Sequence, residues 1–285
     1  MTAGQALRAH LRTVAVAGRL GLAMESNWAP WWGYALYSLV RPLSMSLIIV
    51  VMYLATGAHE PARLTYMFVG NTFFIFVGNV LFGINQVVIE DREHYQMLKY
   101  IYTAPISIYA FLFGRGLTKT AMAAFAVLVT FAFGFAALPL RSGRAAVDGP
   151  LLAAATLLGL AALIFLGILL AGVTLNTARH SGFLSESIAG VLYLFSGAAF
   201  QPSVLPAPLL FLARLSPLTY WIELSRRALV GPPPFETGLE GVSDGAMLAI
   251  LAATTAVSAV ASVLGYRALE RRARSRGKLD QRTDS

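Results

Sequence analysis

Four amide side chains interrupt an otherwise apolar stretch between residues 66 and 89. They are Asn71, Asn79, Asn85 and Gln86. An α-helix turns about 100° per residue, so all four would fall within an arc of about 120° that also contains Phe82. Amides in a lipid environment must face protein or water. The stripe is therefore either the wall of a substrate path or a set of hydrogen bonds between helices, and the pattern favours neither.

A run of charged residues follows this stretch. The segment Glu90 to Pro105 reads EDREHYQMLKYIYTAP, in a chain of which only 13% of residues are charged. Its charged members are Glu90, Asp91, Arg92, Glu93 and Lys99. Charge is costly in a bilayer, so the run predicts a connection between two membrane spans on which something outside the membrane acts.

A third polar group stands near the C-terminal end. Residues 208–230 are apolar overall but contain Arg214, Pro217, Glu223, Arg226 and Arg227. We expect two short helices, broken at Ser216-Pro217, that dip part-way into the outer leaflet, because a full crossing would bury these charges. Glu223 can pair with either arginine at i+3 or i+4. A plain hairpin on the outer leaflet is the alternative.

No known catalytic or metal-binding pattern accompanies these groups. The chain has no cysteine, no phosphate-binding loop of the G-x-x-x-x-G-K-[ST] type and no H-E-x-x-H pair, and its four histidines are scattered. We therefore predict a protein that is not an enzyme and that binds no metal or cofactor. The net charge of +8 is better explained by basic cytoplasmic loops than by nucleic-acid binding.

The elements that must position these groups are membrane helices. The chain is 57% hydrophobic with a mean hydropathy of +0.66, which predicts an all-α integral membrane protein, a single domain over residues 1–285. Six stretches are long enough to cross a bilayer. They are Tyr34–Ala55, Tyr66–Ile89, Leu117–Leu138, Pro150–Thr174, Ser187–Val204 and Ala246–Tyr266.

The distribution of basic residues predicts the orientation. With the N-terminus inside, sixteen of the 22 lysines and arginines lie on the cytoplasmic side and six outside. Both termini are therefore expected in the cytoplasm, with residues 267–285 as a basic tail.

Residues 1–30 are predicted to form an amphipathic helix at the cytoplasmic interface, with an ordinary solvated helix as the alternative. The apolar face consists of Leu7, Leu11, Val14, Gly18 and Leu22, and the basic face of Arg8, Arg12 and Arg19. The tryptophans expected at headgroup level are Trp28, Trp31 and Trp32.

This arrangement resembles the type-2 permeases of ATP-binding-cassette (ABC) exporters. The stretch EDREHYQMLKYIYTAPISIYAFLFGR, residues 90–115, resembles the family's acidic loop that leads through a Thr/Ala-Pro to a Gly-Arg. The stretch FSGAAFQPSVLPAPLLFLARLSPLTYWIELSRRALVG, residues 195–231, is similar to the family signature that contains P-L-T-Y and R-x-L-x-G. The SGAAFQPSVLP pattern looks more like the drug and Nod-factor branch than the polysaccharide branch.

The resemblance implies roles for individual residues. The loop 90–105 would carry a coupling helix, Glu90 to Lys99 and including His94 and Tyr95, that docks into a groove of an ATPase subunit. His94-Tyr95 stands where many members have Gly-Thr, which would suit a particular ATPase. The segment 205–231, together with the residues just before it, would form an outer re-entrant hairpin and gate. The gate residues would be Pro202, Pro206, Pro217, Glu223, Arg226 and Arg227.

The resemblance also implies partners and a function. We expect two ABC ATPase subunits that hold ATP and Mg²⁺, a second copy of this chain or a paralogue, and a location in the cell membrane. The expected function is the permease half of an exporter of an amphipathic drug, lipid or lipo-oligosaccharide. The alternatives are export of a polysaccharide or teichoic acid, and a membrane scaffold without transport.

Overall fold

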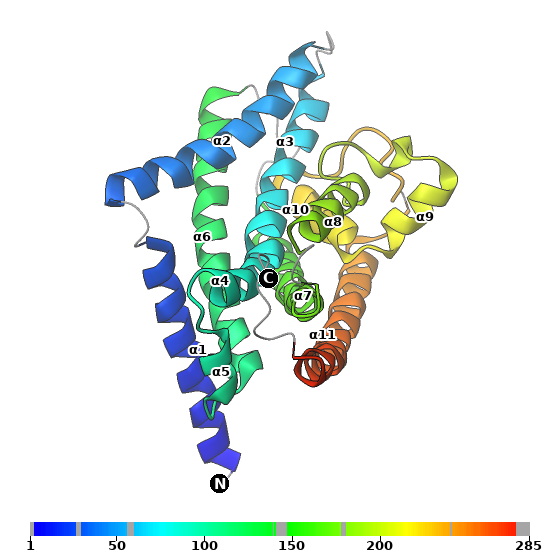
Figure 1. The fold of residues 1–285 in the computed structure, drawn as a ribbon. Coiled ribbons are helices and arrows are strands. Elements are labelled where there is room, and N and C mark those ends of the chain that lie inside the picture. The colour runs from blue at the N-terminus through cyan, green and yellow to red at the C-terminus, as the bar shows by residue number, and fades with distance from the viewer. Residues whose placement is uncertain are drawn as a thin grey trace.

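The structure is a computed structural model that describes residues 3–26, 30–55, 60–138, 140, 147–177, 181–239 and 241–277. Helices make up its regular structure throughout this part of the chain, which confirms the predicted all-α class. In chain order the helices are α1 (Ala3–Ser26), α2 (Trp31–Ala55), α3 (Pro61–Phe76), the π-helix η1 (Val77–Leu81), α4 (Phe82–Glu93), α5 (Leu98–Thr103), α6 (Ile108–Ala137), α7 (Gly149–Thr174), α8 (Ser181–Phe195), the 3₁₀ helix η3 (Pro202–Val204), α9 (Ala207–Leu215), α10 (Pro217–Val230) and α11 (Asp244–Ser275) (Figure 1).

Four helices in the described part are long and apolar enough to cross a membrane. They are the continuous helix Pro61–Glu93, formed by α3, η1 and α4, together with α6, α7 and α11. The other two predicted spans correspond to α2 and α8, in which the apolar stretches among the described residues are Pro42–Ala55 and Gly182–Phe195. At 1.5 Å per residue, the 15 residues of α8 are shorter than a hydrocarbon core of about 30 Å, whereas the 25 residues of α2 can reach across it.

The predicted fifth span is wrong in its bounds. We expected it to run from Ser187 to Val204, but α8 begins at Ser181 and ends at Phe195. Gly197 adopts a φ of +70°, a left-handed conformation that ends a helix and suits glycine. Pro202 then begins the separate 3₁₀ turn.

Capping side chains explain where three of the long helices begin. Ser107 accepts a hydrogen bond from the Ala110 amide at the start of α6. Asp148 does so for the Leu151 amide at α7, and Ser243 for the first turn of α11. Each cap satisfies an amide that the helix itself leaves without an acceptor.

Small residues let the helices approach closely. A Cβ on Gly159 of α7 would lie 2.4 Å from the indole of Trp221, which is fully buried in α10. A Cβ on Gly114 of α6 would lie 2.4 Å from the Val14 carbonyl oxygen of α1. Close helix packing of this kind is typical of membrane bundles, and it seats α1 beside the first half of α6 (Figure 1).

Helix α1 agrees with the predicted helix over residues 1–30 in position and in its basic face, since Arg8, Arg12 and Arg19 are exposed. Val14 and Gly18 of the predicted apolar face contact α6 through their backbone. Ala17 and Gly21 contact α6, whereas Leu7, Leu11 and Leu22 stay exposed. Trp28 and the side chains of Trp31 and Trp32 lie outside what the structure describes.

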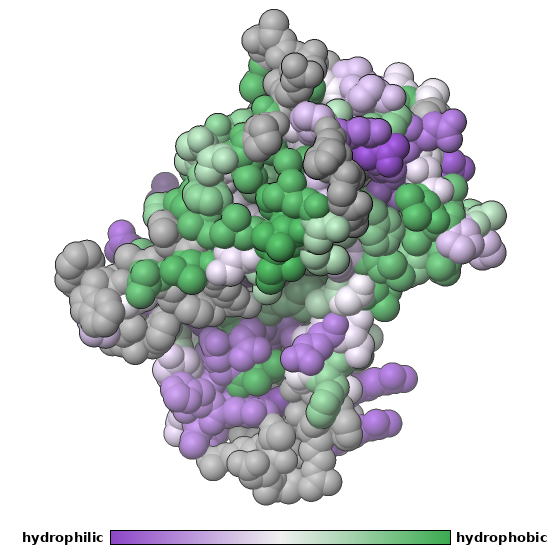
Figure 2. Space-filling model, turned by 90° about the horizontal axis from the view of Figure 1, so that it is seen from above, coloured by the Kyte–Doolittle hydropathy of each residue, from purple (hydrophilic) through white to green (hydrophobic). Residues whose placement is uncertain are grey.

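The surface carries the hydropathy expected for a lipid environment. Figure 2 shows an apolar band across the middle of one face, with hydrophilic residues gathered at two margins. Large apolar side chains such as Leu128 of α6, Leu157 of α7 and Val257 of α11 are about 70% exposed. Exposure on this scale, on the helices long enough to span, indicates contact with lipid rather than water.

Candidate functional site

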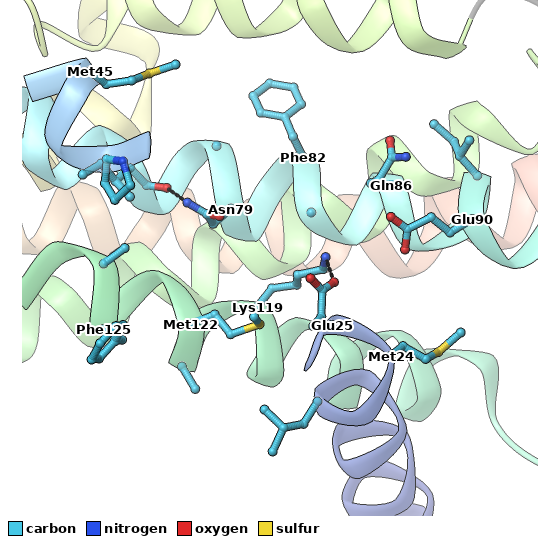
Figure 3. Close-up of a pocket in the computed structure, with 18 of the residues that line it drawn as sticks. Met24, Glu25, Met45, Asn79, Phe82, Gln86, Glu90, Lys119, Met122 and Phe125 are labelled. Atoms are coloured by element: carbon cyan, nitrogen blue, oxygen red, sulfur yellow. Dashed lines mark hydrogen bonds and ion pairs between the residues drawn. The ribbon is translucent and has the colours of Figure 1, made fainter. Parts of the chain in front are cut away.

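A cavity of 1460 Å³ lies between α1, α2, the α3–η1–α4 helix and α6. Four of the five residues predicted for a substrate path line it: Asn71, Asn79, Phe82 and Gln86. Figure 3 shows Asn79, Phe82 and Gln86 on the long helix, and Met122 and Phe125 on the neighbouring α6. The mixture of amide, aromatic and thioether groups suits a molecule with both polar and apolar parts.

Asn85 departs from the predicted stripe, and the π-helix explains why. The Phe82 amide donates to the Val77 carbonyl, five residues back. A π-turn places one extra residue in the turn, so α4 is rotated by about 100° from the phase that a continuous α-helix would have. Gln86 consequently shares the cavity with Asn71, while Asn85 turns away from it.

The two roles considered for the amide stripe, a cavity wall and hydrogen bonds between helices, belong to different residues. Asn85 is buried and links three helices: its amide donates to the Ser185 hydroxyl at 2.7 Å, and its carbonyl accepts from the Thr174 hydroxyl. Among the described residues, Asn79 donates to the Ile75 carbonyl of its own helix, at 2.9 Å, and to no other helix. Asn85 therefore connects helices, whereas the Asn79 side chain remains at the cavity wall.

Asn71 combines both roles. It lines the cavity, accepts a hydrogen bond from the Tyr193 hydroxyl at 3.2 Å, and donates to the Met45 carbonyl at 3.5 Å. The interaction with Tyr193 connects the long helix to α8.

One end of the cavity is lined by charged residues, and two of them were not predicted from the sequence. Glu25 of α1 and Lys119 of α6 form an ion pair there, and Lys119 packs over Gly83. We expected residue 119 near the start of a span that began at Leu117, but α6 begins at Ile108, so Lys119 lies three turns inside the helix. A lone lysine within an apolar helix was the available signal.

The predicted coupling segment has a different structure from the one expected. Glu90 to Glu93 complete α4, a turn follows, and the separate short helix is α5, Leu98–Thr103, rather than Glu90 to Lys99. Gln96 in the turn has a φ of +52°, which is uncommon for a residue other than glycine. Pro105 does lie in the connection to α6, before its cap at Ser107.

Burial separates the predicted coupling residues into two groups. Asp91 and Arg92 are 1% and 4% exposed, and Arg92 donates to the Thr174 carbonyl of α7 at 3.1 Å. They are therefore not part of an outer surface in this conformation. His94, Tyr95 and Lys99 are exposed, and Glu93 is partly exposed. Glu90, His94 and Tyr95 also border the charged end of the cavity.

Hydrogen bonds connect helix α5 and the start of α6 to the last helix, α11. The hydroxyls of Tyr102 and Tyr266 are 2.7 Å apart. Burial raises the pKa of Tyr102 above its usual range, so its hydroxyl keeps its proton. The neighbouring Tyr109 hydroxyl donates to the Val263 carbonyl of α11 at 2.9 Å.

The segment before the last helix consists of two short helices, as predicted. α9 ends at Leu215 and α10 begins at Pro217, with Ser216 between them. Pro202 opens η3, and Pro206 precedes the first residue of α9. Proline fits at these helix starts because it has no amide proton to leave without an acceptor.

The predicted ion pairs of Glu223 are confirmed. Its carboxylate lies 3.7 Å from Arg226 Nη1 and 3.2 Å from Arg227 Nε, and it is 2% exposed. Arg227 continues the network to Asp244 at the start of α11, at 3.0 Å. Asp244 was not among the predicted residues.

Arg226 connects α10 to α3 through groups that sequence reasoning also missed. The Tyr66 hydroxyl donates to Glu223, and the Arg226 guanidinium carbon lies 3.6 Å from the centre of the Tyr66 ring. Arg226 also donates to the carbonyls of Tyr66 and Gly197, at 2.9 and 2.6 Å. These long-range contacts give no signal in a single sequence.

The chain was compared with known proteins. The family model described as ABC-2 type transporter matches residues 23–230, a range that includes the cavity-lining helices, the loop around α5 and both short helices α9 and α10. No curated protein matches the chain.

Proposed function

Because the chain belongs to the ABC-2 type transporter family, we propose that it is the transmembrane permease subunit of an ATP-driven exporter of an amphipathic compound. The observation that carries this proposal is the cavity. It joins amides and aromatic rings inside the bundle to a charged end beside the loop of His94 and Tyr95. A membrane scaffold has no need of such a space.

In the proposed topology, α2 and α8 complete six spans around the four long helices, and both termini face the cytoplasm. Lysine and arginine are in excess on the side of the membrane where the N-terminus would lie, and this excess supports the orientation. A helix shorter than the bilayer, such as α8, is accommodated by local thinning or by packing between copies, which fits the proposed pairing with a second permease.

The proposed contact with the ATPase is the exposed surface formed by His94, Tyr95 and Lys99. Two features support it: these side chains are open, and α5 behind them is fixed to α11 through Tyr102 and Tyr266. A push on this loop would be transmitted to the bundle rather than absorbed by a flexible segment. ATP and Mg²⁺ would be held by the ATPase.

The proposed outer gate is the pair α9 and α10, dipping into the outer leaflet. The network of Glu223, Arg226 and Arg227 supports this role, because it satisfies charges that could not otherwise leave water. Opening such a gate would move α10 against Tyr66 of α3.

Co-purification followed by transport tests the proposal. We expect the tagged full-length chain, expressed with the ABC ATPase subunits of its own cell, to retain one of them in detergent. Reconstituted in liposomes, that complex should move a fluorescent amphiphile only when ATP is hydrolysed. A chain that never retains an ATPase would refute the permease assignment and favour a scaffold. Retention of a lipid-linked glycan instead would favour polysaccharide or teichoic-acid export.

A further inference from the structure

The cavity has two chemically different ends. Figure 3 shows Met45 and Phe125 toward one end, and Glu25, Glu90 and Lys119 toward the other. Phe74, Phe82 and Met122 also line it, so this part of its wall carries aromatic and thioether groups. Methionine and aromatic side chains adapt to apolar ligands of various shapes. The apolar end therefore defines one half of a ligand, and the charged end defines the other.

The charges at the polar end do not balance. Seven charged residues among the described ones lie at this end. Each lines the cavity or interacts with a lining residue or with that residue's neighbour. They are Glu25, Glu90, Asp91, Glu93, Arg92, Arg115 and Lys119. Four carboxylates thus face three cations. Lys119 is taken by Glu25, and Arg92 lies 3.3 Å from Glu93. One cation then remains for two carboxylates.

That remaining cation is Arg115, and it satisfies neither carboxylate fully. Its Nη2 atom lies 3.9 Å from Glu90, too far for a hydrogen bond. Its attraction also acts on Asp91. Asp91 is 1% exposed, and neither of its oxygens has a hydrogen-bond donor among the described residues. Among the described residues beside this end of the cavity, carboxyl groups therefore outnumber cations by one.

Glu90 is the member of this group that a ligand can reach. Its side chain is 32% exposed, it lines the cavity, and it accepts no side-chain hydrogen bond from the described residues. Figure 3 shows its carboxylate directed toward the space shared with Gln86. An anionic ligand would meet three lining carboxylates and a lysine already held by Glu25.

We infer that this cavity binds an amphipathic organic cation, with its positive group at Glu90 and its apolar part along Phe82, Met122 and Phe125. Glu90 is thereby a specificity-determining residue inside the cavity rather than a contact of the ATPase. The physiological meaning of the inference rests on the proposed export function, but binding itself needs no ATPase. An amine-headed lipid and a free cationic compound share the required chemistry.

Two probes of nearly equal shape and opposite charge test the inference. The full-length chain in nanodiscs of phosphatidylglycerol would be titrated with tetraphenylphosphonium and with tetraphenylborate, with empty nanodiscs subtracted. We expect saturable binding of the cation and none of the anion. Glu90→Gln should weaken cation binding about tenfold, the effect of losing one charge-assisted contact. Glu60→Gln is the matched control, because Glu60 is exposed outside the cavity and should leave binding unchanged.

Further arms keep the test decisive. Glu90→Asp retains the charge, so it should keep the preference for the cation even if Glu90→Gln lowers stability. Adding phosphatidylethanolamine to the nanodiscs identifies the source of the ligand. If this lipid displaces the probe, the ligand is an amine-headed lipid. If the probe stays bound, the ligand is a free compound. Equal binding of both probes, or full affinity in Glu90→Gln, would overturn the inference.

The inference and the proposed function fail in different ways. Cation binding by a chain that never retains an ATPase would refute the permease assignment alone. ATP-driven export that shows no preference for cations, and that survives Glu90→Gln, would refute the cation site alone.

Discussion

The hydroxyl oxygens of Tyr102 and Tyr266 lie 2.7 Å apart, and this contact joins the short helix α5 to the long helix α11. The two residues are far apart in sequence, yet both belong to one aromatic cluster with Tyr109, whose ring centre is 5.2 Å from that of Tyr266. Any movement imposed on α5 must therefore either carry α11 with it or break this contact. In the proposed complex the contact is a coupling element.

Tyr102→Phe should uncouple the complex. The substitution keeps the ring but leaves the buried Tyr266 hydroxyl without this partner, so we expect a stability loss of about 1–3 kcal/mol. Substrate exported per ATP hydrolysed should fall several-fold, while the ATPase still co-purifies. Tyr53→Phe is the control, because it removes hydrogen bonds to the Glu60 backbone, far from α5. Unchanged coupling in Tyr102→Phe would contradict this role.

Asn79→Leu and Asn85→Leu should separate the two functions of the amide stripe. Within the described part of the chain, the Asn79 side chain bonds to its own helix and to no other, so its replacement should preserve assembly and impair transport. Asn85 links α4 to Ser185 and Thr174, so its replacement should lower stability by about 1–2 kcal/mol, as for other hydrogen bonds between membrane helices. Thermal unfolding in detergent and ATP-dependent transport would be measured on both. The reverse pattern would exclude the proposed division.

Gly70→Ala should destabilise the protein strongly. A Cβ at this position would lie 1.7 Å from Arg226 Nη2 and 2.6 Å from the Ala198 carbonyl oxygen. The guanidinium would have to move, leaving Glu223 without one of its two arginine partners in a buried site, at a cost of about 3 kcal/mol or more. Gly78→Ala is a matched control on the same long helix, since its Cβ would meet nothing within 4 Å. Similar melting temperatures for the two variants would argue against a structural role of the network.

Lys99→Glu should weaken binding of the ATPase without affecting insertion in the membrane. Lys99 is exposed on α5, and among the described residues its ammonium group lies over the ring of the adjacent Tyr100. The reversal therefore changes the surface charge and little else. Arg12→Glu, an exposed reversal on α1, is the control. The amount of ATPase retained on the tagged chain is the readout, and equal retention by both variants would exclude Lys99 from the interface.

Local rules were enough to predict several features of this fold. Glu223, Arg226 and Arg227 are three and four residues apart, and this spacing alone predicted their pairing. The break before Pro217 and the helical class likewise follow from properties of the chain over short distances. The match of α9 and α10 to the expected pair of helices shows how far such rules reach.

Other features depend on packing that a single sequence does not contain. The periodicity argument assumed a regular α-helix, so it placed Asn85 in the cavity. It could not anticipate the π-helix at Val77–Leu81. The burial of Asp91 and Arg92 depends on α6 and α7, which are distant in sequence. For the same reason the pairing of Glu25 with Lys119 emerged only from the structure.

The π-helix has a consequence for comparing this chain with its relatives. Removing one residue from Val77–Leu81 would restore a regular α-helix and turn the following segment by about 100°. Asn85 would then swing toward the cavity and leave Ser185 and Thr174 behind. A one-residue gap in an alignment at this point would therefore signify a different face presented to the transported molecule, rather than a shorter helix.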